Sequence, residues 1–253
     1  FNKMNARQLL ESIAASEGRV IVSETIGNRS PLFDNITNAE LASAMGADMI
    51  ILNLFDVLKP SIQGLPMVEP EETIREVKKL IGRPVGINLE PTVLSDNPEE
   101  NKDWAVTEGR LATTENAVKA HKMGVDFIVL TGNPGTGVTN EAITDSIQRI
   151  REALGDDIIL VTGKMHGSGI LSESGEKIIT KADVEAFCKA GADIILFPAP
   201  GTIPGITTEY IRSLVSYAHS LGRMTLTAIG TAQEGTDTDT IKRIALECKM
   251  TGT

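Results

Sequence analysis

The chain has 253 residues, of which 41% are hydrophobic and 23% are charged, and its formal net charge is −10. Apolar runs such as Met49–Leu52 are short, whereas a membrane-spanning helix needs about 20 apolar residues, so membrane spans are excluded. The lysine and arginine residues form no basic patch, which argues against nucleic-acid binding. Two cysteines are too few for a disulfide framework and favour a cytoplasmic location.

Three segments repeat one pattern: MGADMIILN at 45–53, MGVDFIVLT at 123–131 and AGADIILFP at 190–198. The glycine can take the left-handed conformation that ends a helix. The apolar run after it is typical of a parallel strand that is buried on both faces. The repeat therefore predicts helices that alternate with buried parallel strands.

In chain order, a first helix is expected at 5–17, and strands and helices alternate after it. The predicted strands are Val20–Glu24, Met49–Asn53, Val85–Glu90, Phe127–Thr131, Ile158–Thr162, Ile194–Phe197 and Thr225–Ile229. The predicted helices are 38–46, 69–82, 111–124, 139–154, 180–190, 207–221 and 237–249.

This alternation fits either a doubly wound open sheet or a (β/α)8 TIM barrel. The strand spacing of about 30–35 residues and the absence of G-x-G-x-x-G after the first strand favour the barrel. We therefore expect one barrel domain over residues 1–253, with an extra N-terminal helix. Only four residues follow Lys249, too few for an eighth strand, and the chain starts at Phe1. We expect truncation, and the alternative is that a neighbouring chain or the N-terminal segment closes the barrel.

Polar side chains gather where the predicted strands end, which is where TIM barrels hold their active sites. In LVTGKMH, alternation should place Thr162, Lys164 and His166 on one face. Burying a lysine there is costly. Lys164 is therefore either a catalytic or substrate-binding residue or the ion-pair partner of a neighbouring carboxylate. His166 is the one histidine at a strand end, and it is a candidate acid, base, substrate donor or metal ligand.

Two glutamates, Glu24 and Glu90, close apolar strands, and each could act as a general base or pair with a lysine. Together with Asp56, Glu90 could also hold a magnesium ion, which accepts one or two carboxylates plus water and substrate oxygens. Residue types alone leave these roles open.

A glycine-rich loop, TGNPGTGVTN at 131–140, follows the fourth strand. Its backbone N–H groups could bind an anion near a helix N-terminus, or it could be a flexible turn with Thr139 as a helix cap. The substrate- or phosphate-binding candidates are Asn53, Asn88, Thr131, Gly132, Asn133, Gly135, Thr136, Gly137 and Gly230. The long stretch Pro91–Arg110, with the only tryptophan, Trp104, is either a lid or a surface insertion.

The motifs TGNPGTGVTN, GADMIILNLFDV and VGINLEP resemble an uncharacterised bacterial TIM-barrel family that is often labelled phosphoenolpyruvate-phosphonomutase-like. A fainter similarity to BtpA-like barrels comes from Thr131-Gly132 through Thr136-Gly137. The resemblance implies a TIM barrel with phosphate or carboxylate ligands. The acidic metal-binding clusters of phosphonomutase and isocitrate lyase have no residue-by-residue match here, so their activity is not carried over.

The main hypothesis is a lyase or isomerase that acts on a small phosphorylated, sugar-derived substrate. Lys164 would be a Schiff-base nucleophile or an electrostatic clamp, Glu24 or Glu90 the base, and His166 an acid or donor. One alternative is a Mg²⁺-dependent C–C or C–P lyase that uses Asp56 and Glu90. Another is a non-catalytic sensor of a phosphorylated metabolite. The expected partners are a small phosphorylated or carboxylated substrate and further copies of the chain in a homo-oligomer.

Overall fold

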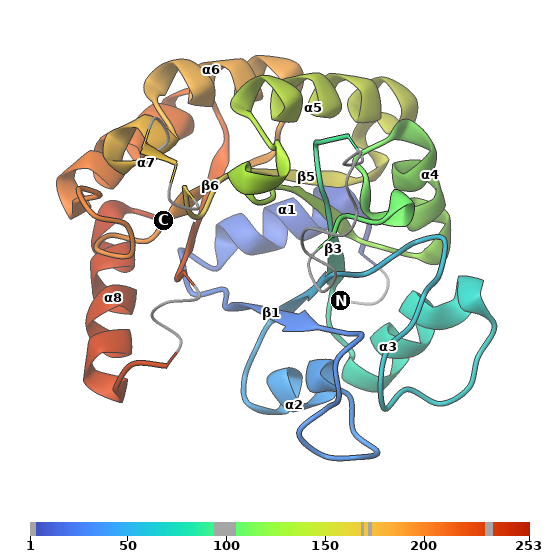
Figure 1. The fold of residues 1–253 in the computed structure, drawn as a ribbon. Helices are drawn as coiled ribbons and strands as arrows, with labels where there is room; N and C mark the ends of the chain where they lie inside the picture. The colour runs from blue at the N-terminus through green and yellow to red at the C-terminus, as the bar shows by residue number, and fades with distance from the viewer. Residues whose placement is uncertain (1–3, 94–104, 168–169, 172–173, 231–234) are drawn as a thin grey trace. The chain divides into compact units, whose positions relative to one another are not determined.

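Helices and strands alternate along the chain (Figure 1), which divides into two compact units. The first unit comprises residues 1–129 and 149–159, and the second comprises residues 130–148 and 160–253. The computed structural model describes residues 4–93, 105–167, 170–171, 174–230 and 235–253. Both units contain parallel strands connected by helices, which confirms the predicted α/β class. The expectation of one domain over the whole chain stays a prediction.

The strands of the first unit follow the order β1-β2-β3-β4, and β4 reaches the second unit with its last residue. Every residue of β3 and β4 is buried, whereas β1 is partly exposed. The elements are α1 (Ala6–Ala15), β1 (Val22–Ile26), α2 (Asn38–Ala44), β2 (Met49–Asn53), α3 (Thr73–Ile81), β3 (Val85–Leu89), α4 (Thr114–Met123) and β4 (Phe127–Leu130).

The strands of the second unit follow the order β5-β6-β7. All residues of β5 and β6 are buried, and those of β7 are partly exposed. The elements are α5 (Asn140–Leu154), whose C-terminal turns belong to the first unit, β5 (Ile159–Gly163), α6 (Lys181–Ala190), β6 (Ile194–Pro198), α7 (Thr208–Ser220), β7 (Met224–Ala228) and α8 (Thr238–Thr251). No described helix is both long and apolar enough to cross a membrane.

The aspartate of the repeated Gly-x-Asp pattern sets the register of the parallel strands. Asp48, Asp126 and Asp193 each accept a hydrogen bond from a backbone N–H at the start of the preceding strand, at 2.8–2.9 Å. The backbone N–H of each aspartate donates to the carbonyl of that same residue. The glycine two residues earlier has a positive φ, for example 95° at Gly124, so it ends the helix and turns the chain into the strand.

One strand boundary differs from the sequence prediction in a way that affects a site residue. The first strand was expected to end at Glu24, but β1 runs from Val22 to Ile26, and Glu24 is its middle residue. The backbone N–H of Ile21 donates to the Asp48 carboxylate, and the ladder with β2 begins one residue later. The expectation that Glu24 closes its strand is therefore wrong.

Candidate functional site

In the first unit, the register of β1, β2 and β3 gathers predicted site residues on one face. Glu24 pairs with Ile51, and Ile51 pairs with Gly86. Side chains alternate along a strand, so Asn53 and Asn88, each two residues further on, share the face of Glu24. The Asn53 side chain donates to Glu24 Oε1 at 2.6 Å. Asn88 is buried, and its Oδ1 has no hydrogen-bond partner among the described residues.

Glu90, which follows β3, forms a buried ion pair with Arg110. Arg110 also donates to the backbone carbonyl of Ala105 at 2.9 Å. The backbone N–H of Glu90 donates to the carbonyl of Arg110 at 2.7 Å. Burial raises the pKa of the Glu90 carboxyl, and the charge and hydrogen bond of Arg110 oppose that rise. The pair thus joins the two ends of the 91–110 segment, and residues 94–104, with Trp104, lie outside the described structure.

The sequence prediction missed Arg110 as the partner of Glu90. A signal was present, because the long 91–110 segment has an acidic residue directly before it and ends on a basic residue. Opposite charges at both ends of an insertion can close it with an ion pair.

Asp56, after β2, is occupied by hydrogen bonds from the protein. Its Oδ1 accepts from the backbone N–H groups of Leu58 and Lys59, at 2.8 and 2.9 Å, and its Oδ2 accepts from the Thr107 hydroxyl at 2.7 Å. A β-carbon on Gly109 would lie 1.8 Å from Asp56 Oδ1, so the segment around Gly109 packs directly on this carboxylate. Asp56 therefore fastens one loop to another.

These contacts do not fit the magnesium site that was considered for Asp56 and Glu90. Both carboxylates are engaged, one with backbone and hydroxyl donors and the other with Arg110. Within the part of the chain that the structure describes, no group of three or more His, Cys, Asp or Glu side chains is arranged to hold a metal.

Replacing Asp56 with alanine should lower the stability of the folded chain by about 1–3 kcal/mol, because three donors lose their acceptor. Thermal unfolding measures this, with Asp34→Ala, at an exposed residue, as the control. The loss should be the same with magnesium and with chelator. A loss that appears only when magnesium is present would restore the metal-ligand interpretation.

In the second unit, Lys164 directly follows β5 and is only 1% exposed. Thr162, two residues earlier, and Thr131, directly after β4, are also buried, at 0% and 2% exposure. The hydroxyl oxygens of both threonines have no hydrogen-bond partner among the described residues. A buried polar atom without a partner costs free energy, and an apolar residue of the same shape would avoid that cost. The two hydroxyls are therefore candidate ligand contacts.

His166 lies two residues beyond Lys164 and is partly buried. Burial lowers the pKa of its imidazole below the ordinary value of 6.5. The ring is therefore neutral at pH 7 and is able to accept a proton.

The glycine-rich loop uses several of its own N–H groups. Residues Pro134–Thr136 form one turn of 3-10 helix, and the Asn133 side chain accepts from the N–H of Gly135 at 2.7 Å. The N–H of Thr136 donates to the carbonyl of Asn133, and that of Gly137 donates to the carbonyl of Pro134. These three N–H groups therefore serve the turn. Gly132 is half-buried, and so is Gly230 after β7.

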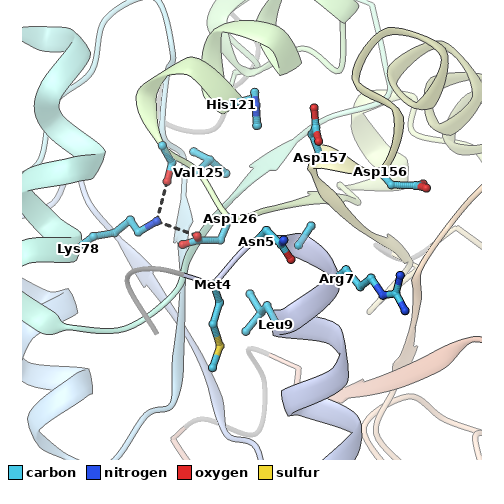
Figure 2. A pocket seen from close by; sticks show the side chains of 12 residues that line it. Met4, Asn5, Arg7, Leu9, Lys78, His121, Val125, Asp126, Asp156 and Asp157 are labelled. Atoms are coloured by element: carbon cyan, nitrogen blue, oxygen red, sulfur yellow. Dashed lines mark hydrogen bonds and ion pairs between the residues drawn. The ribbon is translucent and has the colours of Figure 1, made fainter.

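A cavity of about 630 Å³ lies in the first unit, and none of its lining residues is a predicted site residue (Figure 2). The first turn of α1 lines it together with Asp126, which precedes β4, and Asp157. Lys78 and Asp126 in its wall form an ion pair at 2.7 Å. The cavity thus lies where β4 begins, which is the end of the strands that serves stability, and not catalysis, in TIM barrels.

The fold resembles solved structures of lyases, hydrolases and aldolases. The matches include 2,3-dimethylmalate lyase, a member of the PEP mutase/isocitrate lyase superfamily, with a TM-score of 0.57, 13% identity, and coverage of 98% of this chain and 79% of that one. Phosphonopyruvate hydrolase matches with a TM-score of 0.54, 15% identity, and coverage of 96% and 78%. Deoxyribose phosphate aldolase from Aeropyrum pernix matches with a TM-score of 0.52, 15% identity, and coverage of 98% of this chain and 91% of that one.

At these identities the likeness shows the fold alone. It confirms the resemblance to the fold of the PEP mutase/isocitrate lyase superfamily. The fainter similarity to BtpA-like barrels stays a prediction. No curated protein matches the sequence. The profile of a family described as "Domain of unknown function (DUF7916)" matches residues 1–253.

Proposed function

We propose that the chain, which belongs to the DUF7916 family, is a lyase that binds a small carbonyl substrate covalently through Lys164. One observation carries this proposal: a lysine with 1% exposure lies directly after β5, and two buried threonine hydroxyls at the ends of β4 and β5 have no hydrogen-bond partner within the described part of the chain. The ends of parallel strands are where barrels of this class place reacting groups. The alternative is an isomerase that acts on the same kind of substrate.

In the proposed reaction, the Nζ of Lys164 attacks the substrate carbonyl carbon. The carbonyl oxygen leaves as water, with one proton from the amine and one from solvent, as the protonated imine forms. The C–C bond next to the imine carbon then breaks, and its electron pair moves into the imine to give an enamine. The hydroxyl on the departing carbon loses its proton and becomes a carbonyl. The enamine carbon takes up a proton, and water hydrolyses the imine to release the second product and the free lysine.

We assign the proton transfers in this reaction to His166. Its lowered pKa keeps the imidazole neutral, so that it can take the proton of the departing hydroxyl and return it to the enamine carbon. Acid protonates this base, so the rate should fall as the pH drops through the pKa of His166, which lies below 6.5. Loss of activity at a pH well above 6.5 would not come from this group.

Thr131 and Thr162 are proposed to donate to substrate oxygens, with Thr131 on the phosphate or carboxylate. The N–H groups of Gly135, Thr136 and Gly137 are committed to their own turn. The substrate is accordingly proposed to be a small phosphorylated or carboxylated aldehyde or ketone.

Glu24 accepts a hydrogen bond from Asn53 in the first unit and takes no step in the reaction above, so its role as a general base stays a prediction. Glu90 is assigned to the ion pair with Arg110. A cytoplasmic location and a homo-oligomer stay predictions.

Replacing Thr162 with valine should leave the unliganded protein as stable or about 1 kcal/mol more stable, because an unpartnered buried hydroxyl is removed. It should also reduce ligand-induced stabilisation. Thr25→Val is the matched control, because the Thr25 hydroxyl is likewise buried without a partner but lies in the first unit. Thermal unfolding with and without dihydroxyacetone phosphate measures both effects. An equal loss of ligand response in both variants would contradict the role of Thr162.

Thermal unfolding with a small ligand panel tests the proposed function as a whole. The carbonyl probes are dihydroxyacetone phosphate, glyceraldehyde 3-phosphate and pyruvate, and the matched probes without a carbonyl are glycerol 3-phosphate and lactate. A ligand at about 100 times its dissociation constant adds about 2.7 kcal/mol, which is a shift of about 5–10 °C for this chain length. We expect a carbonyl probe to stabilise the protein in chelator more than its matched probe does. Stabilisation that requires magnesium, or none with any probe, would contradict the proposal.

A further inference from the structure

Gly163 lies between the two buried residues Thr162 and Lys164, as the last residue of β5. It pairs in register with Leu196 of β6. A β-carbon at position 163 would lie 2.0 Å from the carbonyl oxygen of Leu196, 2.9 Å from its carbonyl carbon and 3.0 Å from its Cβ. Two of these atoms are backbone, so no side-chain rotation could relieve the overlap. Its φ of 154° is also one that residues with a side chain rarely adopt.

Only glycine therefore allows the end of β5 to approach β6 this closely. Any other residue would move the two backbones apart where the chain continues into Lys164. The Lys164 side chain is among the largest fully buried ones of the described residues, so we expect it to move together with its backbone. A shift of the backbone at position 163 therefore becomes a shift of the Lys164 amine.

We infer that Gly163 is a positioning residue for Lys164: its missing side chain lets β5 pack against the Leu196 carbonyl and so holds the amine in its buried place. The inference rests on the proposed function only for the catalytic role of the Lys164 amine, because the packing of Gly163 against β6 does not depend on any reaction. A misplacement of about 1 Å is enough to reduce catalysis by about a hundredfold.

The test compares Gly163→Ala with a second strand glycine whose replacement also creates an overlap. A β-carbon on Gly86 of β3 would lie 2.2 Å from the Phe127 ring, so Gly86→Ala strains the first unit without touching Lys164. Both variants are expected to lose stability through overpacking. Their unfolding midpoints are measured first, in buffer and in sucrose, which favours the compact state.

The readout is the chemical accessibility of the Lys164 amine in folded protein. A short pulse of acetic anhydride is followed by peptide mass analysis, and acetylation of Lys164 is divided by that of the exposed Lys59. We expect this ratio to rise about tenfold in Gly163→Ala, which corresponds to about 1.4 kcal/mol of lost protection, and to stay at the wild-type value in Gly86→Ala. Reductive trapping of dihydroxyacetone phosphate should fall in Gly163→Ala alone.

Each other outcome has a separate meaning. An unchanged ratio in Gly163→Ala, or an equal rise in both variants, overturns the inference. So does a Gly163→Ala protein that stays unfolded even in sucrose, because the residue would then serve the whole fold. If wild-type protein traps no carbonyl compound but the acetylation ratio rises only in Gly163→Ala, the proposed function fails and the positioning of Lys164 by Gly163 stands.

Discussion

Replacing Lys164 with methionine is expected to remove all stabilisation by carbonyl ligands while the chain still folds. Methionine fills a similar volume without a polar end, so the cost of the lost lysine contacts is partly offset by the removal of a buried polar group. We therefore expect the free energy of unfolding of the unliganded protein to change by less than about 2 kcal/mol. The stabilisation of about 2.7 kcal/mol that a ligand gives at about 100 times its dissociation constant should disappear. Thermal unfolding with and without the carbonyl probes measures both quantities.

Lys59→Met is the control for this experiment, because Lys59 is exposed and lies in the first unit. It should behave as the wild type in both measurements. If Lys164→Met instead unfolds at a much lower temperature, or keeps its response to carbonyl ligands, Lys164 serves as a structural ion-pair partner and not as a ligand-binding group.

Replacing Arg110 with methionine is expected to destabilise the protein by about 3–5 kcal/mol at pH 8, because it leaves the buried Glu90 carboxylate without its counter-ion. This corresponds to a fall of about 6–20 °C in the unfolding midpoint. The exposed Arg7–Glu11 pair provides the control, and Arg7→Met should leave the midpoint almost unchanged. The double variant Arg110→Met/Glu90→Gln should recover much of the loss, since neither charge remains.

The pH dependence of this loss follows from the raised pKa of Glu90. A carboxyl whose folded pKa lies above its unfolded value contributes stability at low pH, and that contribution is lost as the pH rises through the folded value. Without Arg110, burial is unopposed and the pKa rises further. The gap between variant and wild type should therefore be largest near pH 8 and shrink as the pH falls and Glu90 binds a proton. A gap that is constant with pH would show that the loss comes from packing and not from charge.

Much of the fold could be predicted from one repeated sequence pattern. Its glycine ends a helix and its apolar run forms a buried strand, so the positions of β2, β4 and β6 followed from local rules. The role of the repeated aspartate did not follow, because its partner is a backbone N–H of the previous strand, 27 to 41 residues earlier. Only strand pairing reveals such a contact. The first strand was predicted two residues too early because the contact between Ile21 and Asp48 could not be foreseen.

The candidate site could be predicted in part. The positions of Lys164, Thr131 and Glu90 at strand ends came from alternation and strand length, and the structure gives them little exposure. The partners of these residues could not be predicted. Arg110 reaches Glu90 across a 20-residue gap, and Gly163 matters because of a carbonyl on the neighbouring strand. The hydrogen bonds of the glycine-rich loop could not be predicted either. Its composition alone did not show that its N–H groups donate within a turn of the loop itself.

The most direct test of the account is reductive trapping on the wild-type chain. The protein is incubated in chelator with sodium cyanoborohydride and either dihydroxyacetone phosphate or pyruvate. Its intact mass is then measured by mass spectrometry, and a digest is used to locate the modified peptide. The account predicts one adduct per chain, on the peptide that contains Lys164, and none in Lys164→Arg. An adduct confined to exposed lysines such as Lys59, or a carbonyl compound that stabilises the protein in chelator yet leaves no adduct, would contradict it.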